Sequence, residues 1–257
     1  MNMKVFYPGI QISPYIESYY FTLPREAQGY QCMSFPAVSC GYLKFSTQTS
    51  IVSGQAISPT RIPSDVDLTG FGVKLRIGAI YTLFGIPACE LTNRTVTLDD
   101  ILGNSAAELL ERISESPAAT QKIKHIEDAF IQLAQQNSRK NFSVEFAILE
   151  SLTRDHSISI SRLAEQFGYS PRQLQRKLNN FIGLPPRLFK RIHRFEKILD
   201  AIQNSAQQEN LSWSDLAFSW GYSDQAHFVR DFREFTGRTP TTYIADLKMS
   251  DPFNICE

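Results

Sequence analysis

Residues 163–170 read Leu163-Ala164-Glu165-Gln166-Phe167-Gly168-Tyr169-Ser170, and 53 residues later the chain repeats the pattern as Leu216-Ala217-Phe218-Ser219-Trp220-Gly221-Tyr222-Ser223. Each copy is followed by an amphipathic segment that ends at a glycine, Gly183 or Gly237, and these glycines lie 54 residues apart. The second copy therefore holds one extra residue. Leucine and alanine can pack inward from a short helix, glycine permits the positive φ of a sharp turn, and serine can cap the next helix. The repeat predicts two helix-turn-helix units.

The second helix of each copy is expected to have an apolar stripe and a polar face. The stripes consist of Leu174, Leu178 and Phe181 in the first copy and of Phe228, Phe232 and Phe235 in the second. The polar faces carry Arg172, Gln173, Gln175, Arg176 and Asn179 in the first copy, and Gln225, Ala226, His227 and Arg230 in the second. Arginine, glutamine, asparagine and histidine can donate hydrogen bonds to base edges in the DNA major groove. One polar face is typical of any soluble helix, but its occurrence in both copies favours DNA reading.

Charge is concentrated in one part of the chain. The 257 residues include 26 basic and 26 acidic side chains, so the formal net charge is zero, which argues against a nonspecific coat on nucleic acid. Between Ile158 and Leu199, however, nine basic residues face only two acidic ones, whereas residues 200–246 contain three basic and seven acidic residues. The first of these regions is suited to an anionic partner.

Residues 158–247 resemble the DNA-binding domain of AraC/XylS-type transcriptional regulators. The resemblance rests on the two copies and on the long spaced pattern from Gly221 to Tyr243, which includes Phe228-Val229-Arg230-Asp231-Phe232 and Gly237-Arg238-Thr239-Pro240. It implies two helix-turn-helix units joined by a long helix at about residues 186–201. The two recognition helices would enter adjacent major grooves on one face of the duplex, with some bending of the DNA.

The resemblance also implies roles for individual residues. It assigns base reading to Arg172, Gln175, Arg176, Gln225, Ala226, His227 and Arg230, with Ala226 limited to an apolar contact such as a thymine methyl. It assigns contacts with the DNA backbone to Lys177, Lys190, Arg191, Arg194 and Arg233. Acidic Asp224, Asp231 and Glu234 surround the second recognition helix, so contact with RNA polymerase stays open as a further role of that unit.

The N-terminal half is expected to be rich in strands as far as about residue 95. Short aromatic and β-branched runs such as residues 19–23 and 41–45 are separated by Gly, Pro and Ser, and residues 72–77 alternate apolar with basic side chains. Two amphipathic helices follow at 104–116 and 120–135. The stretch from Phe84 to Arg94 resembles the N-terminal domain found in a subset of the same regulators. That resemblance implies a cupin-like β-barrel or sandwich followed by helices.

The expected architecture is therefore an α+β multidomain chain. A β-rich sensor or assembly domain covers residues 1–135, a polar linker 136–141, an all-α DNA-binding domain 142–248 and a tail 249–257. Candidates for an effector pocket are the strand aromatics and one cation that could meet a carboxylate: Tyr19, Phe21, Phe35, Tyr42, Phe45, Phe71 and Arg76. Filling of the barrel is the more ordinary role for such aromatics. The helices at 104–116 and 120–135 could form a dimer seam or pack on their own barrel.

Enzyme chemistry is not expected. The four histidines show no ligand spacing, and the sequence lacks the GxSxG, HExxH, P-loop and GxGxxG motifs. Cys32, Cys40, Cys89 and Cys256 lie far apart, which favours reduced thiols over disulfides or a metal site. Two alternatives remain: a regulator related to a DNA-repair methyltransferase that uses the same helical domain, which would need four grouped thiolates, and a protein-interaction adaptor.

Together these features predict a cytoplasmic, sequence-specific transcription regulator that binds double-stranded promoter DNA. No run of about 18 apolar residues is present, so a membrane span is not expected. No cofactor and no metal are expected. RNA polymerase, a small-molecule effector and a second copy of the chain remain candidate partners.

Overall fold

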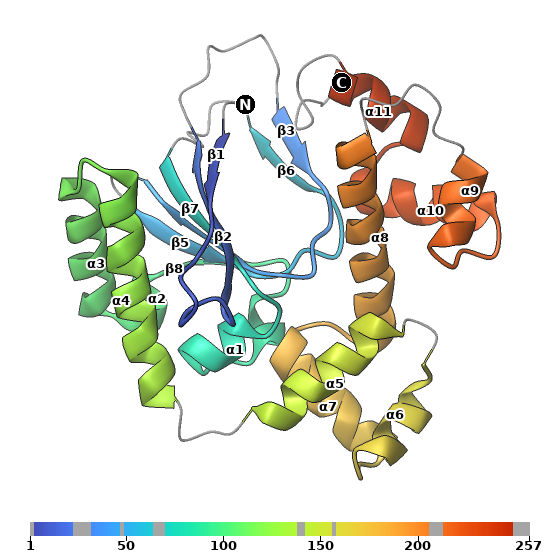
Figure 1. Ribbon diagram of the computed structural model, residues 1–257, viewed down its shortest axis with the longest axis horizontal. Helices are drawn as coiled ribbons and strands as arrows, with labels where there is room; N and C mark the ends of the chain where they lie inside the picture. The colour runs from blue at the N-terminus through green and yellow to red at the C-terminus, as the bar shows by residue number, and fades with distance from the viewer. Residues whose placement is uncertain are drawn as a thin grey trace. The chain divides into compact units, whose positions relative to one another are not determined.

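The structure is a computed structural model that describes residues 3–22, 32–46, 49–63, 70–137, 142–155, 158–205 and 213–248 (Figure 1). It is a mixed α/β fold with a sheet formed by the N-terminal half and helices in the C-terminal half. By its internal contacts the chain separates into two compact units. Unit 1 comprises Met1–Arg25, Cys40–Gln55 and Leu68–Pro186; unit 2 comprises Glu26–Ser39, Ala56–Asp67 and Arg187–Glu257. Each unit thus combines segments of both halves, and the division expected near residues 136–141 stays a prediction.

The strands are β1 (Met3–Phe6), β2 (Ile16–Thr22), β3 (Cys32–Phe35), β4 (Tyr42–Phe45), β5 (Ser50–Ser53), β6 (Thr60–Pro63), β7 (Gly70–Leu75) and β8 (Thr95–Thr97). The helices that accompany the sheet are α1 (Ala79–Phe84), the 3-10 helix η1 (Ala88–Leu91), α2 (Asp99–Leu102), α3 (Asn104–Glu115) and α4 (Ala119–Asn137). The later helices are α5 (Ser143–Arg154), α6 (Ile160–Gln166), α7 (Pro171–Ile182), α8 (Pro186–Ser205), α9 (Trp213–Ser219), α10 (Gln225–Thr236) and α11 (Pro240–Lys248).

Six strands form one sheet in the order β1-β2-β7-β4-β5-β8. All its pairs are antiparallel, and Val73 of β7 lies between Tyr19 of β2 and Leu43 of β4. Among the described residues, β1 and β8 each pair with a single neighbour, so this sheet is open. The cupin-like closure expected from the resemblance is therefore not confirmed.

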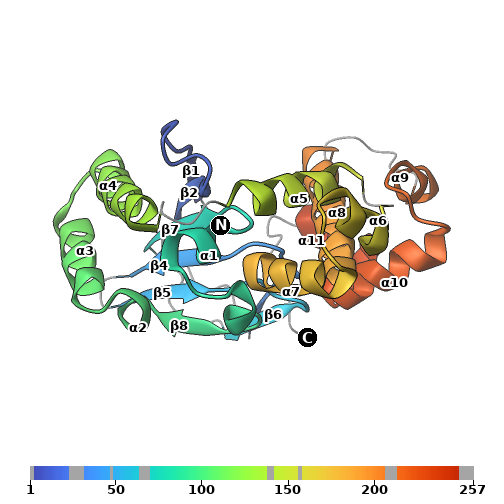
Figure 2. The same cartoon turned by 90° about the horizontal axis from the view of Figure 1, so that it is seen from below.

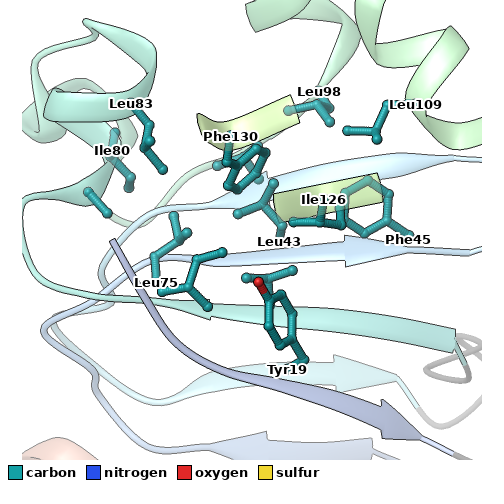
Figure 3. Packing of buried hydrophobic residues seen from close by; sticks show 14 of the residues in the cluster. Tyr19, Leu43, Phe45, Leu75, Ile80, Leu83, Leu98, Leu109, Ile126 and Phe130 are labelled. Carbon is teal, nitrogen blue, oxygen red and sulfur yellow. The ribbon is translucent and has the colours of Figure 1, made fainter. Parts of the chain in front are cut away.

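The core of unit 1 lies between one face of the sheet and the helices that cover it (Figure 3). Tyr19, Leu43 and Leu75 extend from the strands toward Ile126 and Phe130 of α4. The apolar residues of α3 and α4 that suggested a dimer seam, including Leu109, Ile113 and Ile126, are buried in this core. In this structure these apolar residues pack on the chain's own open sheet, and the two helices run side by side in both views (Figure 1, Figure 2).

Most elements expected from the sequence are present, with one correction. The predicted helices at 104–116 and 120–135 correspond to α3 and α4, and the predicted joining helix corresponds to α8. The expectation of strands throughout residues 1–95 was wrong for α1 and η1. In α1, Ile80 and Leu83 are three residues apart, which is helical spacing, and both pack into the core. Most of the expected linker and the tail 249–257 with Cys256 lie outside the described residues. None of the described helices is long and apolar enough to cross a membrane.

In unit 2 the two-stranded sheet β3-β6 belongs with α8 and α10. The backbone N–H of Ala37 donates to the carbonyl of Phe235 at 2.8 Å, at the end of α10. The Glu196 side chain of α8 accepts from the backbone N–H of Ser39 at 3.0 Å and also from the Ser39 hydroxyl. These bonds tie a segment of the N-terminal half to α8 and to the end of α10.

Candidate nucleic-acid interface

The first repeat forms the helix pair α6–α7, and its turn has the expected chemistry. Gly168 has a φ of 70°, the left-handed conformation that the repeat predicted. Ser170 caps α7 by accepting from the backbone N–H of Gln173 at 3.3 Å, and Gln173 returns the bond by accepting from the Ser170 N–H at 2.9 Å. This capping box fixes the start of α7, and it occupies the side-chain amide oxygen of Gln173, Oε1.

The faces of α7 divide as the spacing predicted. Leu174, Leu178 and Phe181 are buried, which confirms the expected inward stripe. Arg172, Gln175 and Arg176 are exposed together on the opposite side. Lys177, assigned to the DNA backbone, is only partly exposed because its ammonium donates to Glu145 of α5 at 2.7 Å. That hydrogen bond raises the pKa of Lys177.

The second repeat forms the pair α9–α10, with one correction at the cap. The N-cap of α10 is Asp224 rather than Ser223, and its carboxylate accepts from the backbone N–H of His227 at 2.7 Å. The extra residue of the second copy lies in this turn and moves the cap by one position. The cap and a hydrogen bond from Ser223 lower the pKa of Asp224.

The exposed face of α10 carries the residues assigned to base reading. Gln225, Ala226 and Arg230 are exposed, and His227 is partly exposed with its ring edge against Tyr222 at a centroid distance of 5.0 Å. Phe228, Phe232 and Phe235 are buried, as the stripe predicted. Tyr222 is also buried, in agreement with a core role for this aromatic.

Asp231 of α10 is a buried carboxylate surrounded by donors from α8 and from the turn before α10. Only 4% of its side chain is exposed. Its Oδ1 accepts from Arg191 at 2.7 Å, and its Oδ2 accepts from Arg194 at 3.5 Å and from the Tyr222 hydroxyl at 3.2 Å. Arg191 also donates to Glu234 at 2.6 Å. Burial opposes the charge of Arg191, but hydrogen bonds to Glu234 and Asp231 outweigh it and raise the pKa of Arg191.

These contacts explain the acidic residues that the sequence left without a role. Asp224 caps the helix, while Asp231 and Glu234 bind arginines of α8. A signal for Asp231 was present in the sequence: it lies three residues after Phe228 and four before Phe235, which places it on the inward stripe. Arg191 and Arg194, assigned to DNA phosphates, are engaged inside unit 2 in this structure. Of the remaining residues so assigned, Arg233 is exposed and Lys190 is partly exposed.

The C-terminal end of α7 is held by η1 and the segment around it. Gly183 follows α7 with a φ of 86°, and its carbonyl accepts from the Thr92 hydroxyl at 2.7 Å. The side-chain amide of Gln55 donates to Thr92 Oγ1 at 2.6 Å and to the carbonyl of Ala88 at 2.8 Å. A Cβ at position 183 would lie 1.4 Å from the Gln55 amide nitrogen, so the sequence requires glycine there.

The aromatics proposed for an effector pocket fall into separate environments. Tyr19, Phe21 and Phe45 each stack on Phe71, with centroid distances of 4.7–5.9 Å. Phe35 lies on β3 in unit 2, and Tyr42 lies edge-on to Tyr20. Arg76 is exposed and donates from Nε to the carbonyl of Ser13 at 2.6 Å. Among the residues that the structure describes, no three His, Cys, Asp or Glu side chains are grouped to hold a metal ion.

Comparison with known proteins relates both halves of the chain to described families. A helix-turn-helix domain family matches residues 163–246, and a domain family of unknown function, DUF6597, matches residues 4–97. The probable transcription factor PqrA of Proteus vulgaris is 33% identical over 108 residues, which are 41% of this chain and 85% of PqrA. The putative HTH-type transcriptional regulator YkgA of Escherichia coli (strain K12) is 30% identical over 89 residues, 35% of this chain and 36% of YkgA.

Among solved structures, an apo variant of ToxT from Vibrio cholerae aligns over 95% of this chain and 96% of that chain. The sequence identity is 10% and the TM-score is 0.43. A likeness of this size supports no further conclusion about this chain.

Proposed function

The chain belongs to the AraC/XylS family of transcriptional regulators, and on that premise we propose that it reads promoter DNA with α7 and α10 as paired recognition helices. Members of this family are DNA-binding regulators and not enzymes, in agreement with the expected lack of catalytic activity. The observation that carries the proposal is the matched exposure of Arg176 and Arg230. Counted back from the closing glycines, they occupy the same position in the two helices.

We propose that each helix pair is a helix-turn-helix unit whose second helix enters a major groove. Arg172, Gln175 and Arg176 would read the first half-site; Gln225, Ala226, His227 and Arg230 would read the second. Arginine can bond a guanine bidentately, and glutamine can do the same to an adenine. Two helices on one face of the duplex require half-sites about one helical turn, roughly 34 Å, apart.

Cationic side chains beside these helices would contact phosphates. The resemblance assigns this role to Lys177, Lys190, Arg191, Arg194 and Arg233. The exposure of Arg233 supports its assignment directly, whereas Lys177, Arg191 and Arg194 already bind carboxylates in this structure. Each phosphate neutralised releases counterions, so affinity should fall steeply with salt.

The N-terminal half would regulate this reading in the cytoplasm, through a small-molecule effector or through dimerisation. The cupin-like sensor domain remains part of this proposal, and so does an effector pocket lined by the candidate residues of unit 1, which are Tyr19, Phe21, Tyr42, Phe45, Phe71 and Arg76; Phe35 belongs to unit 2. So do the expected domain division and contact with RNA polymerase. Support comes from the family match at residues 4–97, which covers a domain separate from the DNA-binding match.

The test is selection of bound duplexes by the full chain from a random pool, with sequencing, at two salt concentrations. Enrichment of a bipartite motif with halves one helical turn apart is the expected result. Enrichment of a single half would show that only one helix reads bases, and would leave protein contact as the role of the other. Equal binding of every sequence would reject sequence-specific reading altogether.

A further inference from the structure

The two recognition helices share a second matched position, directly after the matched arginines. The offset of 54 residues between the closing glycines pairs Arg176 with Arg230 and therefore Lys177 with Asp231. The two residues have opposite charges, yet each binds the helix that precedes its own helix pair. Lys177 binds Glu145 of α5, and Asp231 binds Arg191 and Arg194 of α8.

We propose that Lys177 and Asp231 are positioning residues that fix the rotation of α7 and α10 and so aim Arg176 and Arg230 at the bases. This inference rests on the proposed function and deepens it. It also gives Arg191 and Arg194 a role in holding α10 in place of contact with phosphate.

The strongest support for the inference is the geometry around Asp231. Asp231 receives hydrogen bonds from two arginines and one tyrosine, a directional arrangement that an apolar contact does not provide. Arg194 also stacks over the Tyr222 ring at 3.8 Å and donates to the carbonyl of Gly221 at 3.1 Å. A single arginine of α8 thus holds α10 and the turn that leads into it.

The ion pair between Lys177 and Glu145 holds α7 in a similar way, with fewer contacts. The Lys177 ammonium lies 2.7 Å from Glu145, whose side chain is 12% exposed, and 5.3 Å from the centre of the Tyr169 ring. Tyr169 lies one residue before the cap of α7, and Tyr222 lies two residues before the cap of α10. In both pairs the turn tyrosine lies beside the ion pair.

Helical geometry connects these ion pairs to base reading. Successive residues of an α-helix are about 100° apart around the axis, so an ion pair at one residue sets the direction of its neighbour. Buried ion pairs often add little net stability, and the best-attested reason to keep one is that it fixes register. Removal of Asp231 would leave Arg191 and Arg194 without their shared carboxylate and release the rotation of α10.

The experiment uses the full chain and the bipartite duplex obtained from the selection. Arg176→Ala and Arg230→Ala first identify which half-site each helix reads. Affinity is then measured for the intact duplex and for duplexes with one half scrambled, over a range of salt concentrations. The ratio of the two affinities reports discrimination at that half, and the slope of affinity against salt reports phosphate contacts.

We expect Asp231→Asn and Arg194→Lys to lower discrimination at the α10 half-site by fivefold or more, with the salt slope and the α7 half-site unchanged. Glu145→Gln should do the same at the α7 half-site. Glu150→Gln is the matched control, because Glu150 also lies on α5 and pairs with Arg154, but at the surface; it should change neither half. The double change Glu145→Lys with Lys177→Glu should restore discrimination that Lys177→Glu alone removes.

Three results would overturn the inference. Unchanged discrimination in Asp231→Asn and Arg194→Lys, with circular dichroism showing an intact fold, would remove the positioning role. An equal loss on all duplexes together with a lower salt slope would make Arg191 and Arg194 phosphate contacts. If the double change Glu145→Lys with Lys177→Glu did not restore discrimination, the positioning role of the Lys177–Glu145 ion pair would be rejected. A wild-type chain that selects no sequence would instead reject the proposed function, and the inference with it.

Discussion

At the scale of single residues, Arg176 offers the most direct test of base reading. Its side chain is exposed on α7, and a bidentate contact with guanine contributes about 1–3 kcal/mol of discrimination against the wrong base. We expect Arg176→Ala to weaken binding to the selected duplex by that amount and to relax preference at one base pair. Competition binding on single-base variants of the duplex measures both effects.

Arg154→Ala is the control for that substitution. Arg154 is also an exposed arginine, but it lies on α5 and pairs with Glu150. Its loss should leave base preference unchanged. If Arg176→Ala instead lowered affinity equally for every base-pair variant, Arg176 would be a phosphate contact.

Gly183 and Gly168 separate two costs of replacing a glycine. Both have positive φ, and such a conformation costs about 1–2 kcal/mol for alanine. A Cβ at Gly168 meets nothing within 4 Å, whereas one at Gly183 meets the Gln55 amide. We expect Gly168→Ala to lower the free energy of unfolding by the backbone cost alone, and Gly183→Ala by roughly 1–3 kcal/mol more because of overpacking. Urea denaturation compares them; equal losses would contradict the close approach of Gln55.

At the scale of elements, the cap of α10 makes stability depend on pH. The hydrogen bonds from the backbone of His227 and from Ser223 hold the pKa of Asp224 below its ordinary value of 3.8 in the folded state. The ionised cap therefore stabilises the fold above pH 3.8, and this contribution is lost as pH falls through the lower folded pKa. We expect Asp224→Asn, which keeps an acceptor, to remove this dependence. Thermal denaturation from pH 7 to 3 should show the two melting temperatures converging at low pH; a constant difference would contradict the ionised cap.

The helices were predictable from sequence because their signals are local. Apolar spacing and glycine turns located the helix pairs, and the inward stripes of α7 and α10 were correct. A single residue of offset was enough to misplace the second cap, since Ser223 and Asp224 are both good caps in sequence. The partners of Asp231 could not be predicted from local patterns, because Arg191 and Arg194 lie some 40 residues earlier.

The open sheet and the segments that make up each unit could not be predicted from local sequence patterns. Strand order places β7 between β2 and β4, although β3, β5 and β6 intervene in sequence. The contact of Ala37 with Phe235 likewise joins segments that no periodicity relates. Such pairings depend on which surfaces find partners when the whole chain packs, which a single sequence does not display.

At the scale of the whole molecule, α7 and α10 both end against segments of the N-terminal half. The end of α7 is held by Thr92 through Gly183, and the end of α10 is held by Ala37 through Phe235. Phe181 of α7 also packs against Gly78, where a Cβ would come within 2.4 Å of its ring, and edge-on to Tyr81. The ends of α7 and α10 are thus held by the N-terminal half, which would give that half a physical means to influence the DNA reading that we propose for these helices.

A fragment of residues 142–257 would lose all of these contacts at once. We therefore expect the backbone amides in the last turns of α7 and α10 to exchange with deuterium faster in the fragment than in the full chain. Amides around Phe228, at the start of α10, are the internal control, because the rings of Tyr222 and Phe232 that pack on Phe228 are retained in the fragment. In the full chain, Thr92→Val should accelerate exchange only at the end of α7. This substitution removes the hydrogen bond to Gly183 but leaves the contact of Ala37 with Phe235 at the end of α10 in place. Equal protection in fragment and full chain would show that the N-terminal segments do not stabilise the reading helices, and regulation would then have to act by another route.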